Sequence, residues 1–240
     1  MKLSLFPLFF LMILLTSRLG YSEEVKRSDL RFTTSVYRQV GERDDSRHFY
    51  IERLLIQPSK KVRPAQVNKI NSELEKLYAS FYGEARHCHE PLTPHPWGYN
   101  VKFDQINVTD EILSIVFESS EACYGRVFFN KIARNFSLRT GALLSAQQML
   151  QKYAPSLLES GAETNRGSVN LGEEAGDMLI EQNKNLIDEG LEERCSSYLK
   201  SSTFRIWLKR DQLVLLPIFL QIDSACHKEY FFQFENAQGH

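Results

Sequence analysis

The sequence has almost no net charge and no long apolar run beyond its first residues. Its 29 Lys and Arg residues are balanced by 30 Asp and Glu residues, which argues against a strongly basic nucleic-acid-binding protein. Hydrophobic residues make up 42% of the 240 residues, so the chain lacks the polar bias of a disordered protein. No segment after residue 22 is apolar enough to span a bilayer. These absences leave a globular chain that buries a core of its own.

Motifs of the common hydrolases and of nucleotide-binding proteins are also missing. The sequence contains neither G-x-S-x-G nor H-E-x-x-H, the patterns that position a nucleophilic serine or a catalytic zinc. Its glycines are too scattered to form a phosphate-binding loop. Pairs of carboxylates occur, but a glycosidase needs two of them held across a cleft, and sequence does not reveal such a placement. The sequence therefore favours a non-catalytic protein without a cofactor. A hydrolase with an unrecognised site is the alternative.

Residues 1–22 have the layout of a secretory signal peptide. An apolar run over residues 3–15 follows a single basic residue, and Gly20 and Ser22 are small residues at the −3 and −1 positions of a cut after Ser22. The run is shorter than the roughly 20 residues that span a bilayer, although an uncleaved N-terminal anchor is the alternative. We expect a mature chain of residues 23–240, forming a single domain in the periplasm or outside the cell.

Four cysteines in an exported chain are expected to form disulfides. They are Cys88, Cys123, Cys195 and Cys226. Four cysteines allow three pairings, and their spacing alone does not choose among them. We expect Cys88–Cys123 and Cys195–Cys226, because each pair then joins a helical or loop segment to a strand nearby in sequence. A redox centre is disfavoured, since the sequence contains no C-x-x-C.

The apolar patterns predict an α+β fold with a mostly antiparallel sheet and helices packed on one face. The clearest helix begins at Pro64, carries apolar residues at helical spacing as far as Phe81, and is expected to stop at Gly83 before a loop over residues 84–98. Runs rich in β-branched and aromatic residues predict strands at 31–40, 48–57, 99–108, 111–118, 123–130, 132–138, 203–209, 212–222 and 229–235.

Two further helical regions flank a polar segment in the second half of the chain. Ser145 and Gln148 have the spacing of an imperfect capping box, and Pro155 is expected to kink or split the helix that follows. Residues 159–172 are rich in Gly, Ser and Asn and are predicted to form a mobile loop. Residues 173–199 return to helical composition. Strands and helices are thus segregated along the chain, which argues against a doubly wound parallel sheet.

The stretch of residues 112–150 resembles the core of the DUF3298/DUF4163 type of exported domain. Its second strand ends in a form of the family signature nFDl.tG, which here reads Asn-Phe-Ser-Leu-Arg-Thr-Gly over residues 135–141. Residues 70–78 resemble the early helix of the family, and residues 204–226 resemble its closing pair of strands.

The sequence departs from the family at two places. Ser137 replaces the Asp of the signature, and residues 124–127 read Tyr-Gly-Arg-Val where the family commonly has Gly-Gly-Ala-His. A role attached to that His cannot be carried over. The family is similar to sensor ectodomains that bind lysozyme and to accessory domains of peptidoglycan deacetylases. The resemblance therefore implies an envelope-facing module that binds an envelope protein, a lysozyme-like enzyme or peptidoglycan.

Aromatic and basic residues near this turn are the candidate contact surface for such a partner. They are Tyr124, Arg126, Phe128 and Phe129. Aromatic and Arg side chains supply much of the binding energy at protein interfaces. The competing interpretation is that Phe128 or Phe129 faces the core, because successive residues of a strand point to opposite faces.

Three histidines surround the first cysteine and form a second candidate site. His87 and His89 would share a face of an extended segment, and His95 would complete a metal site. The alternative is a surface loop beside a disulfide, in which Cys88 is oxidised and cannot act as a thiolate ligand. A metal-binding module using this loop is thus a further alternative function.

Overall fold

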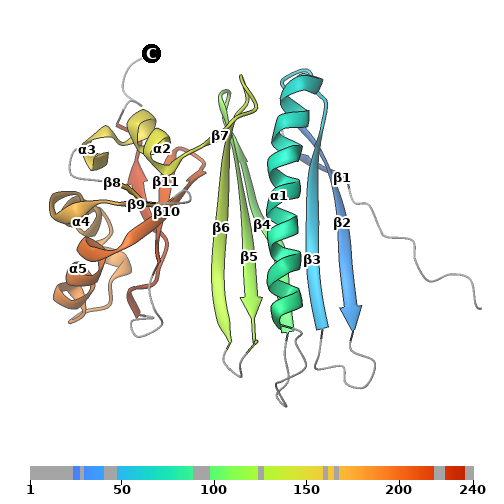
Figure 1. Ribbon diagram of the computed structural model, residues 1–240. Coiled ribbons are helices and arrows are strands. Elements are labelled where there is room, and N and C mark those ends of the chain that lie inside the picture. The colour runs from blue at the N-terminus through green and yellow to red at the C-terminus, as the bar shows by residue number, and fades with distance from the viewer. Residues whose placement is uncertain are drawn as a thin grey trace, which may run out of the picture.

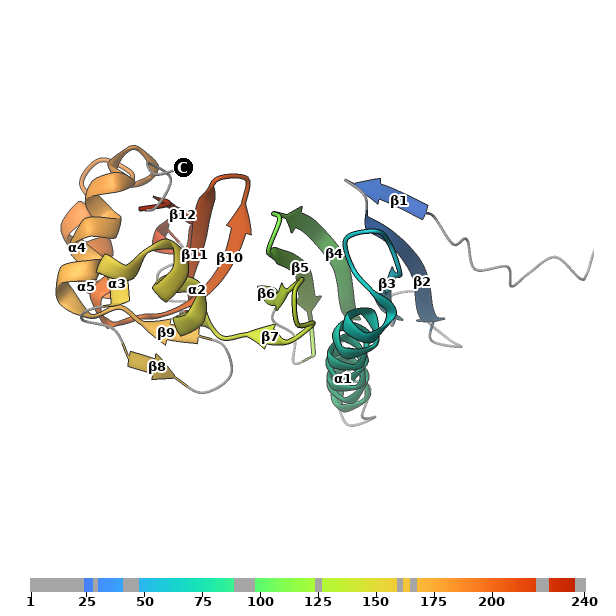
Figure 2. The same ribbon diagram turned by 90° about the horizontal axis from the view of Figure 1, so that it is seen from above.

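The structure is a computed structural model, and it describes residues 24–27, 30–40, 48–88, 98–123, 127–158, 162–164, 168–218 and 225–235. The predicted signal segment lies outside the described residues. Two sheets stand side by side, and each has its helices on the side away from the other sheet (Figures 1 and 2). The predicted α+β class is confirmed, but the strands form two sheets where one was expected.

The first sheet contains seven strands in sequence order. They are β1 (Glu24–Arg27), β2 (Leu30–Val40), β3 (His48–Gln57), β4 (Gly98–Val108), β5 (Ile112–Glu121), β6 (Phe128–Ser137) and β7 (Leu143–Leu144). All neighbours are antiparallel except β3 and β4, which are parallel because the long helix α1 (Pro64–Cys88) connects them. The two strands predicted at 123–130 and 132–138 are one strand, since β6 pairs without interruption along β5.

Helix α1 covers one face of the first sheet with the predicted apolar stripe. Its residues from Val67 to Phe81 at helical spacing are buried in the first core. The helix does not stop at Gly83 but continues to Cys88, which also shortens the predicted loop over residues 84–98. The physical reason is that Ala85 and Cys88 extend the buried stripe, and this burial outweighs the low helix propensity of one glycine.

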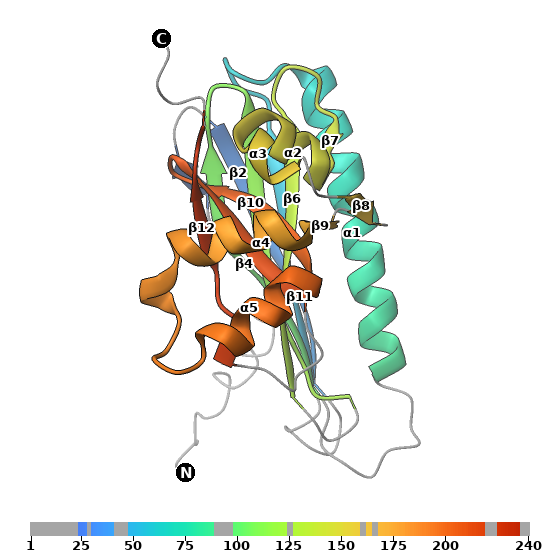
Figure 3. The same ribbon diagram turned by 90° about the vertical axis from the view of Figure 1, so that its left-hand side faces the viewer.

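The second sheet contains five strands in the order β12-β11-β10-β9-β8. They are β8 (Ala162–Thr164), β9 (Ser168–Asn170), β10 (Thr203–Lys209), β11 (Gln212–Ile218) and β12 (Tyr230–Gln233). The helices on its outer face are α2 (Ala146–Tyr153), α3 (Pro155–Leu158), α4 (Gly172–Gln182), the short 3₁₀ helix η1 (Lys184–Leu186) and α5 (Glu192–Ser201). Figure 3 shows α4 and α5 lying in front of this sheet.

Two sequence expectations for this half are corrected or refined. The capping box of α2 is complete, because Gln148 N donates to Ser145 Oγ at 3.2 Å and Ser145 N donates to Gln148 Oε1 at 2.9 Å. The segment 159–172, expected to be a loop, contains β8, β9 and the start of α4. Its buried Val169 pairs with Phe204 of β10, which gives this polar segment a strand partner.

Apolar side chains form three buried clusters, one for each layer boundary. The first lies between α1 and the first sheet, and the second lies between the second sheet and its helices. The third, smaller cluster lies between the two sheets and consists of Val116, Trp207, Val214 and Leu216. Neighbouring residues of β10 thus serve different cores, since Ile206 packs toward the helices and Trp207 packs toward the first sheet.

Both predicted disulfides are present. Cys88 at the end of α1 is bonded to Cys123 just after β5, with 4.7 Å between their Cα atoms. Cys195 in α5 is bonded to Cys226 before β12, with a Cα–Cα distance of 5.3 Å. Among the described residues, no helix has the length and apolar character needed to cross a membrane.

Candidate functional site

Three large apolar residues in succession are exposed at the start of β6 and directly before it. Val127, Phe128 and Phe129 are 52%, 38% and 68% exposed. The alternation expected to bury one of the two phenylalanines fails here, because they pair with Glu121 and Ser120 at the end of the β5–β6 hairpin, and neither belongs to a buried cluster. We call these three residues the apolar tip. Of the other residues predicted for the contact surface, Tyr124 and Arg126 lie outside the described residues.

Among the described residues, the outer edge of β6 next to the apolar tip is unpaired over most of its length. Within the described part of the chain, β7 pairs with β6 only at Asn135 and Phe136. An unpaired edge exposes backbone groups that other strands can pair with. Two arginines occupy this edge, because Arg134 Nη1 donates to the carbonyl oxygen of Ala133 at 2.9 Å and Arg205 Nη1 donates to the carbonyl oxygen of Lys131.

The surroundings of these arginines disfavour positive charge. Burial lowers the pKa of Arg134, against the opposing charge of Glu73. Burial and then the charge of Arg134 lower the pKa of Arg205. Both remain protonated, since the guanidinium is a very strong base. Burial, and to a smaller extent the charge of Arg205, also lower the pKa of His227, against a hydrogen bond to the backbone of Pro217 that raises it.

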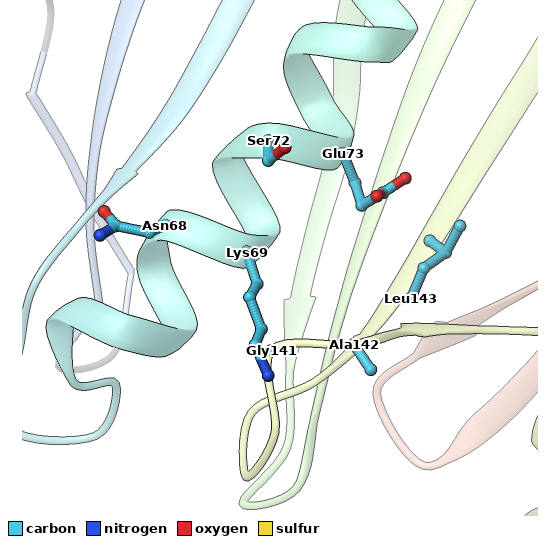
Figure 4. A pocket seen from close by; sticks show the side chains of 7 residues that line it. All are labelled: Asn68, Lys69, Ser72, Glu73, Gly141, Ala142 and Leu143. Carbon is cyan, nitrogen blue, oxygen red and sulfur yellow. The ribbon is translucent and has the colours of Figure 1, made fainter.

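A groove of about 530 Å³ lies between α1 and the segment that leads into β7. The groove is lined by one face of the helix and by the segment that follows the turn after β6. The lining residues are Asn68, Lys69, Ser72, Glu73, Gly141, Ala142 and Leu143. Lys69 and Glu73 project from the helix toward the 141–143 segment (Figure 4). Glu73 is held by Lys76 Nζ at 2.6 Å. The lining contains no histidine or cysteine.

The signature of residues 135–141 lies beside this groove, and its side chains hold the surrounding elements together. Asn135 joins the two sheets, because its Nδ2 donates to the carbonyl oxygen of Ile206 at 2.8 Å and its Oδ1 accepts from Ser114 Oγ at 2.5 Å. Phe136 is fully buried in the first core. Ser137 Oγ accepts from the backbone N–H of Thr140 at 3.3 Å, so the hydroxyl caps the turn that an Asp would also cap.

Gly141 is the signature residue with the strictest steric requirement. Its φ is +72°, and a Cβ atom there would lie 2.7 Å from the carbonyl oxygen of Gln66 and 2.8 Å from its Cα. The turn is fixed to the start of α1 by a further bond, in which Gln66 Nε2 donates to the carbonyl oxygen of Arg139 at 2.9 Å. Glycine is therefore needed where the turn meets the helix backbone.

We expect Gly141→Ala to lower the free energy of unfolding by about 2 kcal/mol, because the substitution combines an unfavourable φ with a backbone clash. Chemical denaturation measures this change. Gly83→Ala is the matched control, since Gly83 lies in α1 with no atom within 4 Å of the added Cβ. That control is expected to stabilise the protein by up to about 1 kcal/mol. Equal unfolding midpoints for the Gly141 variant and the unmodified chain would contradict the close approach.

The predicted histidine site stays a prediction. His87 lies in the exposed last turn of α1, whereas His89 and His95 fall outside the described residues. Cys88 is oxidised in the disulfide and is excluded as a thiolate ligand. Among the described residues, no three His, Cys, Asp or Glu side chains are grouped as metal ligands would be.

Sequence reasoning missed the groove and the arginine pair. Arg134 alternates with Ile132 and Phe136 and therefore faces the same side of β6 as the first core. Arg205 shares its face of β10 with Trp207. A charged residue on an otherwise apolar strand face is a signal that sequence reasoning could have used. The meeting of the two arginines, however, depends on how the sheets pack.

Comparison with known proteins places this fold. No family model and no curated protein matches the sequence. The chain is similar to a solved structure of a DUF3298 family protein from Pseudomonas aeruginosa PAO1, with a TM-score of 0.52 and 13% identity over 90% of this chain and 91% of that one. A DUF3298 family member from Bacteroides fragilis NCTC 9343 has a TM-score of 0.43 and 12% identity over 82% and 84% of the two chains. The first likeness bears out the predicted family resemblance at the level of the fold.

Proposed function

We propose that this chain is an exported, non-catalytic binding module of the bacterial cell envelope. The mature domain comprises residues 23–240, and the apolar tip is the centre of its contact surface, together with Tyr124 and Arg126, which precede it in the sequence. The observation that carries this proposal is the exposure of Phe129, at 68% the most exposed large apolar side chain in the described part of the molecule.

Three features support a contact surface at this end of the hairpin. Contiguous exposed apolar residues mark interaction sites on otherwise polar surfaces. Because successive strand residues point to opposite faces, Phe128 and Phe129 present apolar surface on both sides of β6. The Cys88–Cys123 disulfide ties the end of β5 to the end of α1, which holds the hairpin in place before a partner binds. Such preorganisation reduces the entropy that binding would otherwise lose.

The chemistry of the surface favours a protein partner over a glycan. Aromatic residues and Arg are enriched in protein interfaces, and Val127 adds an aliphatic side chain that gives a sugar hydroxyl no hydrogen bond. We therefore take an envelope protein, such as a lysozyme-like enzyme, as the ligand. Export to the periplasm or beyond is supported by the layout of residues 1–22 and by two disulfides, which form and persist outside the reducing cytosol.

A Phe129→Ser substitution tests the proposal with hen lysozyme and purified peptidoglycan sacculi as probes. Binding to lysozyme is expected to weaken by about 30-fold, because truncating a central aromatic anchor typically costs about 2 kcal/mol. Val36→Ser is the control, since Val36 is 43% exposed on β2 in the same sheet, and its affinity should stay within about twofold of the unmodified chain. Biolayer interferometry measures both.

Two results would overturn this assignment. One is lysozyme binding that the Phe129 variant retains in full, which would place the contact surface elsewhere. The other is binding to sacculi alone or to neither probe, which would remove the protein ligand tested here.

A further inference from the structure

Two arginines from different sheets meet on the open edge of β6. In β6, the backbone N–H of Ser137 donates to the carbonyl oxygen of Ala142 on the β7 side. Backbone groups of alternate strand residues point to the same edge, so those of Ala133 and Lys131 also point to the β7 side. The carbonyls of Lys131 and Ala133 are therefore neighbours on this edge, about 7 Å apart along the strand. Each of them accepts from one guanidinium, that of Arg205 or Arg134. Both guanidinium groups therefore bond to this edge, and the charge of Arg134 reaches Arg205.

Within the described residues, no carboxylate lies within ion-pair distance of Arg134 or Arg205. The two acids whose charges reach them are bound to other partners. Glu73 binds Lys76 Nζ at 2.6 Å, and Glu84 accepts from the Tyr99 hydroxyl at 2.5 Å. The pair therefore carries two positive charges without a counter-ion from this part of the chain.

The bonding capacity of the pair is only partly used. A guanidinium has five N–H donors, and each of these groups uses one terminal nitrogen, Nη1, for its bonds. Arg134 bonds the Ala133 carbonyl, and Arg205 bonds the Lys131 carbonyl and Asn130 Oδ1. Neither guanidinium is fully buried. Among the described residues, no nitrogen of Arg134 or Arg205 is both buried and without a hydrogen-bond partner, so the unused N–H groups contact solvent. Half-buried guanidinium groups bind carboxylate and phosphate oxygens in pairs and gain energy by doing so.

We propose that Arg134 and Arg205 form a binding site for one carboxylate or phosphate group of a ligand at the open edge of β6. An anion there neutralises two adjacent charges and uses N–H groups that the fold leaves available. The alternative role for the two arginines is to block the edge of β6 against pairing with another strand. That role requires only their bonds to the carbonyl oxygens and predicts no binding of anions. The site goes beyond the proposed function, because it is defined without the apolar tip.

Titration with inorganic phosphate and with glutarate at constant ionic strength tests this site. The arginine Nε–Hε resonances of Arg134 and Arg205 should shift with saturation, and Arg205→Gln should weaken binding of the preferred probe at least tenfold. Tighter binding of phosphate assigns a phosphate-bearing ligand, and tighter binding of glutarate assigns a carboxylate-bearing one. Arg139→Gln is the matched control, because Arg139 is an exposed arginine on the turn after β6.

Further variants separate binding from folding. Arg134→Lys keeps the positive charge but loses the planar fork, so it should bind more weakly than the unmodified chain while unfolding at a similar midpoint. Phe129→Ser should leave anion binding unchanged, which separates this site from the proposed contact surface. Absence of saturable shifts at both arginines with both probes, or equal affinities for the Arg205→Gln and Arg139→Gln variants, would overturn the proposal.

Discussion

Replacing Trp207 with alanine is expected to lower the free energy of unfolding by about 3–5 kcal/mol, the range for deleting a buried Trp side chain. Trp207 is fully buried and is the largest member of the cluster between the two sheets. Its neighbours there are Val116 from the first sheet and Val214 and Leu216 from the second. Removing the indole leaves a cavity where the two halves of the molecule pack.

Urea denaturation measures this effect, with Trp207→Phe as the matched variant. The indole Nε1 has no hydrogen-bond partner in the described structure, so phenylalanine loses apolar contact but no hydrogen bond. We expect it to cost less than half as much as alanine. A Trp207→Ala variant within about 1 kcal/mol of the unmodified chain would show that the sheets do not depend on this contact.

Removal of either disulfide is expected to destabilise the protein by about 3–4 kcal/mol, because each closes a loop of similar length, with sequence separations of 35 and 31. The paired substitutions are Cys88→Ser with Cys123→Ser, and Cys195→Ser with Cys226→Ser. Thermal unfolding with and without a reductant measures the effect. The midpoint of the unmodified chain should fall on reduction, and that of a variant lacking all four cysteines should not respond.

The two bridges are expected to differ in their effect on binding. Loss of Cys88–Cys123 releases the hairpin that carries the apolar tip, and so it should weaken lysozyme binding as well as stability. Loss of Cys195–Cys226 acts on the other sheet and should change stability alone. If the unfolding midpoint of the unmodified chain does not change when reductant is added, neither bridge contributes to stability as predicted.

Local periodicity predicted α1 and the strands β2 to β5 close to their observed bounds, whereas β1 and β7 were not predicted and β6 was predicted as two strands. The stripe of α1 and the alternation of β2 and β3 are examples of this periodicity. The second sheet was harder to foresee. Residues 112–117 of β5 are all buried, which is typical of a strand covered on both faces, but a pattern does not identify what covers the second face. The second face of β5 is covered by Trp207, which lies about 90 residues further along the chain.

Part of the candidate site could likewise be predicted from local sequence, and part depends on contacts between distant segments. Phe128 and Phe129 could be named from sequence because aromatic residues near a turn are recognisable, although alternation alone would have buried one of them. Their exposure depends on where the cores end. The pairing of Arg134 with Arg205 joins residues of two sheets, and the groove beside Gly141 requires a turn to meet α1. A local sequence pattern does not predict these contacts between distant segments.

We propose that this chain is exported and works as a rigid, disulfide-linked module. Mass spectrometry of the protein isolated from bacteria that express all 240 residues tests it most directly. We expect an extracytoplasmic product that begins at Glu23, with a mass four hydrogens below that of the tetrathiol. Unreduced peptides should pair Cys88 with Cys123 and Cys195 with Cys226. A cytosolic product that retains residues 1–22 and four free thiols would show that the chain is neither exported nor disulfide-linked.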